Sequence, residues 1–170
     1  MLDKKVTELL NQQINKEFYS AYLYLDFSNY YYDQELNGSG NWYRIQAQEE
    51  RDHAILFMQY LQNNGERIEL EAIAKPDVEL SGNKAVLEAG LKHERYVTSL
   101  IHTIYEAAYN ARDFRTMQFL DWFVKEQGEE ENNAESLVKK YELYGSDPRS
   151  LYMLDSEMAA RVYTAPSLVL

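Results

Sequence analysis

The sequence predicts an all-α protein: a four-helix bundle with a long crossover between its second and third helices and a short fifth helix at the C-terminus. Gly and Pro are scarce, with seven and three residues in a chain of 170, whereas the good helix formers Leu, Ala, Glu and Gln are abundant. Apolar residues recur at helical spacing in four long stretches. A chain of this length suits a single domain, spanning residues 1–170, with a substantial core.

The first two helices form a predicted hairpin. The first helix is expected over about 4–32, where apolar residues recur every three or four positions. The stretch 37–40 reads Asn-Gly-Ser-Gly, which is typical of a turn. The second helix is therefore expected over about 41–63, and it ends before Asn64-Gly65, a common C-terminal signal. The apolar stripe of the first helix consists of Leu10, Ile14, Ala21 and Tyr24.

The segment 66–82 has no helical period and is long for a loop. Fully extended it reaches about 55 Å, whereas the helices are about 40 Å long. It can therefore carry the chain back along the bundle and leave the second and third helices parallel. Helices are then expected over about 83–112, 115–144 and 148–163, followed by a tail, 164–170, with few constraints.

The motif Glu50-x-x-His53 lies within the second helix. Residues at i and i+3 share one face of a helix, and the neighbours of this pair on that face are mostly apolar. A carboxylate that faces a core carries a desolvation cost unless something compensates it. A metal ion is one such compensation, because the motif offers one oxygen and one nitrogen to the same ion.

Three further helices also direct carboxylates inward at the same height. Residues level with each other in a hairpin lie symmetrically about its turn, and the midpoint between Glu17 and Glu50, near residue 33–34, lies within about one helical turn of the first connection. Glu94 and Glu130 are symmetric about the break near Arg112. Buried carboxylates that meet would repel one another or bind protons unless cations bound there. The residues expected to converge are Glu17, Glu50, His53, Glu94, Gln127 and Glu130.

Oxygen ligands with one imidazole suit iron or manganese, with zinc as a competitor. We expect a dinuclear site, because Glu50 can bridge two ions. Simpler interpretations remain for single residues. Glu17 considered alone could be a solvated edge residue, and the acidic run 126–131 could be a solvated face. His93 and His102 fall off the apolar line of their helix and are interpreted as surface or interface residues.

Composition excludes several classes of function. The chain has no cysteine, which removes disulfides, thiol catalysis and cysteine-based zinc sites. The formal net charge of −11 argues against nucleic acid and anionic membranes as partners and favours cations. The sequence shows neither an apolar signal segment nor a long apolar run. We therefore expect a soluble, cytoplasmic protein.

With these residues in place, the chain resembles the bacterial non-haem ferritins over nearly its whole length. The resemblance is carried by Glu17 and Tyr24, by the run Gln48-Glu49-Glu50-Arg51-Asp52-His53, by His93-Glu94, and by Trp122 with Glu126-Gln127-Gly128-Glu129-Glu130. This combination of spacings is specific, and a fifth helix accompanies it. The resemblance implies a ferritin-like four-helix bundle that assembles as a homo-oligomeric shell of twenty-four subunits. Such a shell oxidises Fe²⁺ with O₂ or H₂O₂ and stores the ferric mineral inside.

The resemblance also implies a role for each matching residue. Glu17, Glu50 and His53 would hold the first iron of a ferroxidase centre. Glu50, Glu94 and Glu130, with Gln127 close by, would hold the second. Tyr24 would give or relay an electron beside the centre. Trp122 could share this part, although core packing alone is the favoured interpretation of Trp122. A third iron site would consist of Glu49, Glu126, Glu129 and Glu130.

One departure concerns the fourth helix, which offers Gln127-x-x-Glu130 where a symmetric di-iron bundle repeats Glu-x-x-His. This departure argues against a small-substrate oxygenase. With Asp52 at the place where bacterioferritins have a haem-binding methionine, it also argues against haem. Two alternatives stay open: a rubrerythrin-like di-iron peroxidase that recycles iron without storing it, and a bundle with a structural metal pair or none.

Overall fold

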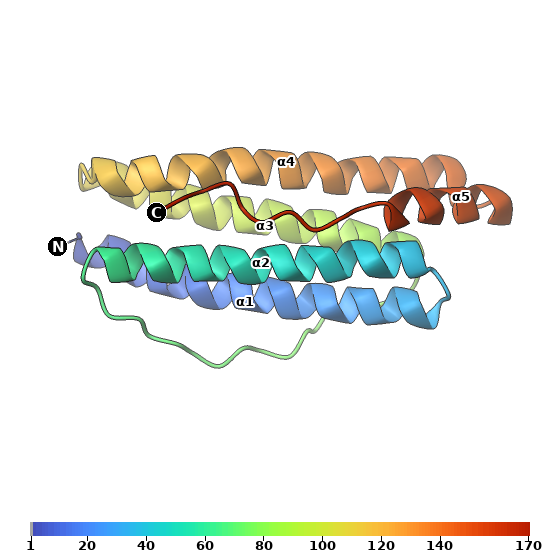
Figure 1. Ribbon diagram of the computed structural model, residues 1–170, viewed down its shortest axis with the longest axis horizontal. Helices are drawn as coiled ribbons and strands as arrows, with labels where there is room; N and C mark the ends of the chain where they lie inside the picture. The colour runs from blue at the N-terminus through green and yellow to red at the C-terminus, as the bar shows by residue number, and fades with distance from the viewer. Residues whose placement is uncertain (1) are drawn as a thin grey trace.

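The computed structural model of this protein describes residues 2–170, and within that range it contains five helices and no strand. The helices are α1 (Lys4–Asp33), α2 (Asn37–Asn63), α3 (Asn83–Asn110), α4 (Phe114–Tyr144) and α5 (Pro148–Ala159). The first four lie side by side as a long bundle, with α5 at one end (Figure 1). The predicted fold class is confirmed. None of the helices within residues 2–170 is both long and apolar enough to span a membrane.

The crossover runs along the outside of the bundle and makes α2 and α3 parallel, as predicted (Figure 1). A row of α1 side chains holds it in place. Asn11 bonds the backbone of Arg67 and Glu69, at 3.1 and 2.9 Å. Asn15 donates to the Ala72 carbonyl at 3.2 Å. Polar residues one helical turn apart on α1 thus satisfy backbone groups of a segment that has no secondary structure of its own.

The start of α2 differs from the sequence prediction. The Asn-Gly-Ser-Gly stretch was expected to be a turn, but α2 begins at Asn37 and includes it. The reason lies in α5, because the Asp155 carboxylate accepts the backbone N–H groups of Gly38 and Ser39, at 2.9 and 2.7 Å. A side chain distant in sequence thus caps the helix. Gly38 also permits the approach, since a Cβ there would lie 1.8 Å from the Asp155 carbonyl oxygen.

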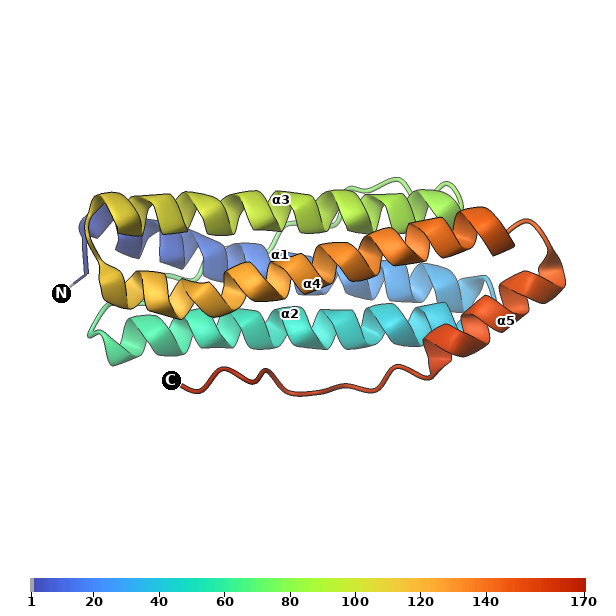
Figure 2. The ribbon, with the colours of Figure 1, turned by 90° about the horizontal axis from the view of Figure 1, so that it is seen from above.

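The C-terminal part also differs from its prediction. Helix α5 ends at Ala159 instead of near residue 163. The tail then returns along α2 (Figure 2). It is held by a hydrogen bond of 3.0 Å from Trp122 Nε1 to Ser167 Oγ, and by packing of Leu168 against the core. The tail is therefore attached to the bundle at several points, although most of its residues are exposed, where the sequence suggested a segment with few constraints.

The bundle core consists of two apolar clusters, one towards each end. One contains Leu10, Phe57 and Phe123, and the other contains Tyr24 and Leu137. Along each of the four helices, the predicted metal ligands fall between the residues of these two clusters. Two dry, well-packed regions therefore enclose a polar layer at the middle of the bundle.

The Asp155 cap gives a first prediction. Asp155→Ala should lower the free energy of unfolding by about 0.5–2 kcal/mol, the usual cost of losing a helix N-cap, because Gly38 and Ser39 would lose their acceptor. Thermal and urea unfolding measure it. Ser156→Ala is the control, because Ser156 is exposed and bonds only within α5. Equal stability of the two variants would contradict the capping role.

Candidate metal centre

All six residues expected to converge are buried, and each comes from the predicted helix. Their exposed fractions are 6% or less. The α1 helix provides Glu17, α2 provides Glu50 and His53, α3 provides Glu94, and α4 provides Gln127 and Glu130.

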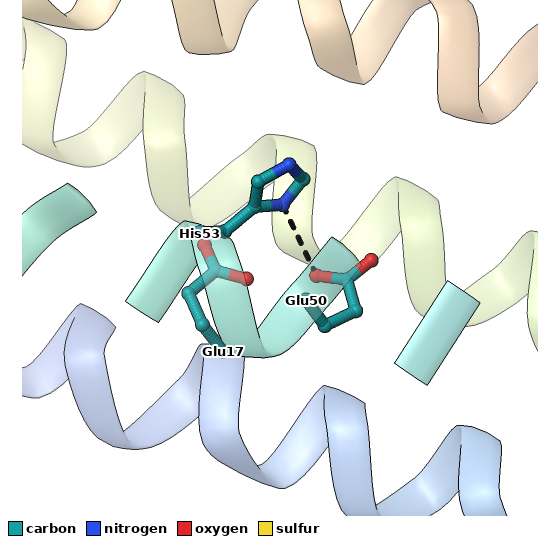
Figure 3. Close-up of side chains that lie close together, drawn as sticks. All are labelled: Glu17, Glu50 and His53. Carbon is teal, nitrogen blue, oxygen red and sulfur yellow. Dashed lines mark ion pairs between the residues drawn. The ribbon is translucent and has the colours of Figure 1, made fainter. Parts of the chain in front are cut away.

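The first half of the centre is the group Glu17, Glu50 and His53. Each residue offers one ligand atom, and these atoms all lie within 4.8 Å of one another. Figure 3 shows Glu17 reaching from α1 towards the pair on α2. His53 Nδ1 lies 3.4 Å from Glu50 Oε2 as an ion pair. The Oε2 atoms of Glu17 and Glu50 are buried and accept no hydrogen bond. Buried oxygens without a hydrogen bond are costly, and the ion pair of 3.4 Å with His53 is the only one that either of them makes within residues 2–170. Their clustering here fits a site that a cation completes.

The second half of the centre is held by hydrogen bonds. Glu94 accepts from the Tyr24 hydroxyl and, at 3.2 Å, from Gln127 Nε2. Glu130 accepts from Gln46 Nε2 at 2.8 Å. The same Gln46 nitrogen also donates to Glu50 at 3.2 Å. Gln46 therefore links the two halves of the centre.

Two glutamines of the centre were not assigned a role from the sequence. Gln13 donates to Glu17 Oε1 at 2.8 Å, and Gln46 donates to Glu50 Oε1. Both lie four residues before the carboxylate they bond. The repeated Gln-x-x-x-Glu spacing on α1 and α2 is the signal that could have identified them, because i and i+4 side chains meet on a helix. They orient the carboxylates and leave the other oxygen of each unbonded.

The electrostatics of the centre favour protons on His53 and on three of the four glutamates when no metal is present. The exception is Glu50, because burial alone would raise its pKa but the contact with His53 lowers it. Burial, together with the charge of Glu50, raises the pKa of Glu17 to about 8 and that of Glu130 to about 7. Burial also raises the pKa of Glu94 well above its usual range. Burial alone would lower the pKa of His53, but the contact with Glu50 and the nearby carboxylates raises it to about 10. Divalent ions can replace these protons, so metal binding should release them.

The residues expected to form a third site lie at the edge of the centre. The Glu49 carboxylate pairs with the Arg161 guanidinium. Glu126 is half-buried, and Glu129 is exposed and lies 3.6 Å from Lys125. Within residues 2–170, the close grouping of candidate ligand atoms comprises Glu17, Glu50 and His53 and does not extend to these glutamates.

The remaining candidates flank the centre. Tyr24 is buried and reaches Glu94 directly. The Trp122 ring lies edge-on to His53, with centroids 5.6 Å apart. His102 is exposed as predicted. His93 is half-buried and shares a 2.8 Å hydrogen bond with Ser20, so it is part of a packed contact between α1 and α3.

The fold and this carboxylate-rich layer define a protein of the ferritin-like class. A family profile described as a ferritin-like domain matches residues 7–144. The chain belongs to this family. It is 38% identical to a bacterial non-heme ferritin of Campylobacter jejuni over 91% of this chain and 93% of that one. It is 35% identical to one of Staphylococcus epidermidis over 96% and 98%. It also superposes on an open pore ferritin of the archaeon Archaeoglobus fulgidus, with a TM-score of 0.93, 41% identity and coverage of 95% and 100%.

The raised pKa of Glu17 gives a prediction for the metal-free protein. The unfolded chain loses this proton near pH 4.5, whereas the folded chain keeps it to about pH 8. The contribution of Glu17 is therefore fully present below pH 4.5 and is lost as the pH rises to about 8. Glu17→Gln cannot ionise, so it should reduce the fall in stability over this range.

The measurement is the thermal midpoint of chelator-treated protein at pH values across this range. Glu8→Gln is the matched control, because Glu8 is exposed on the same helix. If Glu17→Gln follows the same pH course as the parent, Glu17 does not hold a proton in the folded state.

Proposed function

We propose that this protein is an iron-storage subunit with ferroxidase activity. The observation that carries the proposal is the meeting of four buried glutamates from four helices, two of which have an oxygen without a hydrogen-bond partner. Membership of the ferritin family and similarity to proteins named bacterial non-heme ferritin support iron as the metal. The substrate is Fe²⁺, and the oxidant is O₂ or H₂O₂.

In this proposal Glu17, Glu50 and His53 hold one Fe²⁺. Glu50, Glu94 and Glu130 hold the second, and Glu50 bridges the two. Two Fe²⁺ ions give up one electron each, and O₂ takes up these electrons with two protons to form H₂O₂. The carboxylates favour the product because Fe³⁺ is a harder and more highly charged cation than Fe²⁺.

The surrounding residues have supporting parts. Gln13 and Gln46 orient the bound carboxylates. Tyr24 gives or relays an electron, because its hydroxyl already donates to Glu94 and can pass its proton there. The apolar clusters on either side keep bulk water from the reacting ions.

We also propose that the chain assembles into a closed shell, with twenty-four copies as the resemblance implies. Apolar side chains that a lone subunit leaves in water support an assembly. Leu70 and Ile73 on the crossover are 66% and 47% exposed, and Tyr152 and Met153 on α5 are 74% and 65% exposed. A helix as short as α5 also needs neighbours to be stable.

The function is tested by His53→Ala, which removes the only imidazole among the six residues. The fast phase of Fe²⁺ oxidation should slow by roughly tenfold or more while the fold persists. Stopped-flow absorbance at two Fe²⁺ per subunit is the measurement, with His102→Ala as the control because His102 is exposed. An unchanged fast phase in His53→Ala would remove His53 from the ligand set.

Storage is tested separately: the protein is loaded with Fe²⁺ in air and then passed through a gel-filtration column. The parent should elute as a large shell that retains hundreds of irons per subunit. Retention of about two irons per subunit would instead indicate a peroxidase that recycles iron. No oxygen uptake on adding Fe²⁺ would indicate a bundle without this activity.

The asymmetry between the two halves gives a further prediction. Gln127 brings an uncharged amide to the second site, and an amide is a weaker ligand than a carboxylate or an imidazole. The second iron should therefore leave easily after oxidation, which empties the centre for another turnover. Gln127→Glu with Glu130→His should hold both irons more firmly.

The double variant should give a normal first turnover, slow later turnovers and about two irons per subunit after chelation. The rate of each turnover is measured by absorbance during repeated additions of Fe²⁺, and the retained iron is measured after chelation. If the double variant mineralises iron as fast as the parent over many additions, the amide at residue 127 does not set the release of the second iron.

A further inference from the structure

Arg161 lies two residues beyond the end of α5, and its side chain turns back onto α2. One terminal nitrogen, Nη2, donates to Glu49 Oε2. The other, Nη1, donates to Gln46 Oε1 at 2.8 Å and to the Trp42 carbonyl at 3.3 Å. The guanidinium also lies 4.3 Å from the centre of the Trp42 ring. The Arg161 side chain is only 14% exposed, so this contact is largely out of solvent.

The backbone of Arg161 is fixed as well. Its carbonyl accepts a hydrogen bond of 3.1 Å from Asn41 Nδ2. Two residues later, the Tyr163 hydroxyl donates to Asp52. The guanidinium is therefore held in place by the fold before any ligand binds, and little side-chain entropy remains to oppose its contacts.

Glu49 is the carboxylate that Arg161 neutralises, and it adjoins the metal centre. It precedes Glu50, and its pKa is raised by burial and by the charges of Glu50 and Glu126, whereas Arg161 and His53 lower it. A half-buried carboxylate among other carboxylates attracts a cation. In this chain the cation next to it is a side chain, and the ion pair is weakly screened because both groups are mostly out of solvent.

We propose that Arg161 is an internal cation that competes with metal ions for Glu49 and thereby confines metal to the two inner sites. This inference rests on the proposed function, since it assumes that the inner carboxylates bind metal. An ion at Glu49 would have to displace a guanidinium that makes four contacts. Metal binding at this outer position is therefore weak for as long as the C-terminal segment stays docked on α2.

The same guanidinium also acts on the centre through Gln46. The guanidinium donates a hydrogen bond to the side-chain oxygen of Gln46. The Gln46 amide nitrogen therefore faces the centre, where it donates to Glu50 and Glu130. Arg161 is thus a positioning residue for the pair of carboxylates that serve opposite halves of the centre. The C-terminal segment is linked in this way to the inner sites as well as to the outer one.

The test is a calorimetric titration of the assembled, metal-free protein with Zn²⁺. Zn²⁺ reports binding without oxidation chemistry. The parent should bind two ions per subunit, with any third ion weak. Arg161→Ala should bind a third ion at least roughly tenfold more tightly than the parent, because the charge-assisted hydrogen bond to Glu49 no longer competes. Arg161→Ala with Glu49→Gln should return to two ions.

Two controls separate the local effect from net charge and from misfolding. Arg149→Ala removes one positive charge from an exposed position on α5 and should bind like the parent. Arg161→Lys keeps a charge near Glu49 without the planar fork, so a third ion should bind with intermediate strength. If Arg161→Ala does not assemble, Arg161→Lys still tests the inference. A third ion that binds Arg161→Lys no more tightly than it binds the parent would then overturn the inference.

The outcomes distinguish this inference from the function on which it rests. Two tight ions in both the parent and Arg161→Ala, with no strengthened third ion, would overturn the inference and leave the proposed function standing. A third ion that survives Glu49→Gln in the double variant would overturn it as well. A parent that binds no Zn²⁺ tightly would overturn the metal centre itself, and the inference with it.

Discussion

The main constraint on the bundle is the desolvation cost of the four glutamates buried at its middle. An unpaired carboxylate buried in an apolar interior costs on the order of several kcal/mol. The structure offsets this cost with amide donors, with one imidazole and with protons held at raised pKa values. Each offset is partial, since Glu17 and Glu50 still have an unbonded oxygen. The apolar clusters lie on both sides of the layer, and within it the ligand atoms of Glu17, Glu50 and His53 lie within 4.8 Å of one another.

The C-terminal segment completes a polar system that the four long helices leave unfinished. Asp155 caps the first turn of α2, and Arg161 binds the side chains of Glu49 and Gln46 farther along the same helix. The Asp155 carboxylate is an acceptor for N–H groups that have no acceptor within α2, and the Arg161 guanidinium is a cation for the Glu49 carboxylate. The helix that carries the Glu50-x-x-His53 motif is therefore fixed from outside the bundle as well as from within.

The residues of the inner centre could be predicted because helical periodicity and hairpin symmetry fix their height and direction. Glu50 and His53 share a face by spacing alone, and Glu17 and Glu94 reach the same level because each hairpin turn is short. Gln46 was not assigned, because its Gln-x-x-x-Glu spacing to Glu50 gains a meaning only when the same spacing is noticed between Gln13 and Glu17. The Asn-Gly-Ser-Gly stretch was assigned wrongly, because local turn preference was outweighed by the distant Asp155 cap.

The sequence by itself determined the all-α bundle, the parallel course of α2 and α3, and the direction in which the inner carboxylates point. These features follow from periods of three or four residues and from the reach of an extended chain, which are local properties. Only the tertiary structure decided where α2 begins, how the tail lies and which cation stands beside Glu49. Those features depend on contacts between residues far apart in the sequence, such as the Asp155 carboxylate with the Gly38 backbone and the Arg161 guanidinium with Glu49, whose pairing no local pattern specifies.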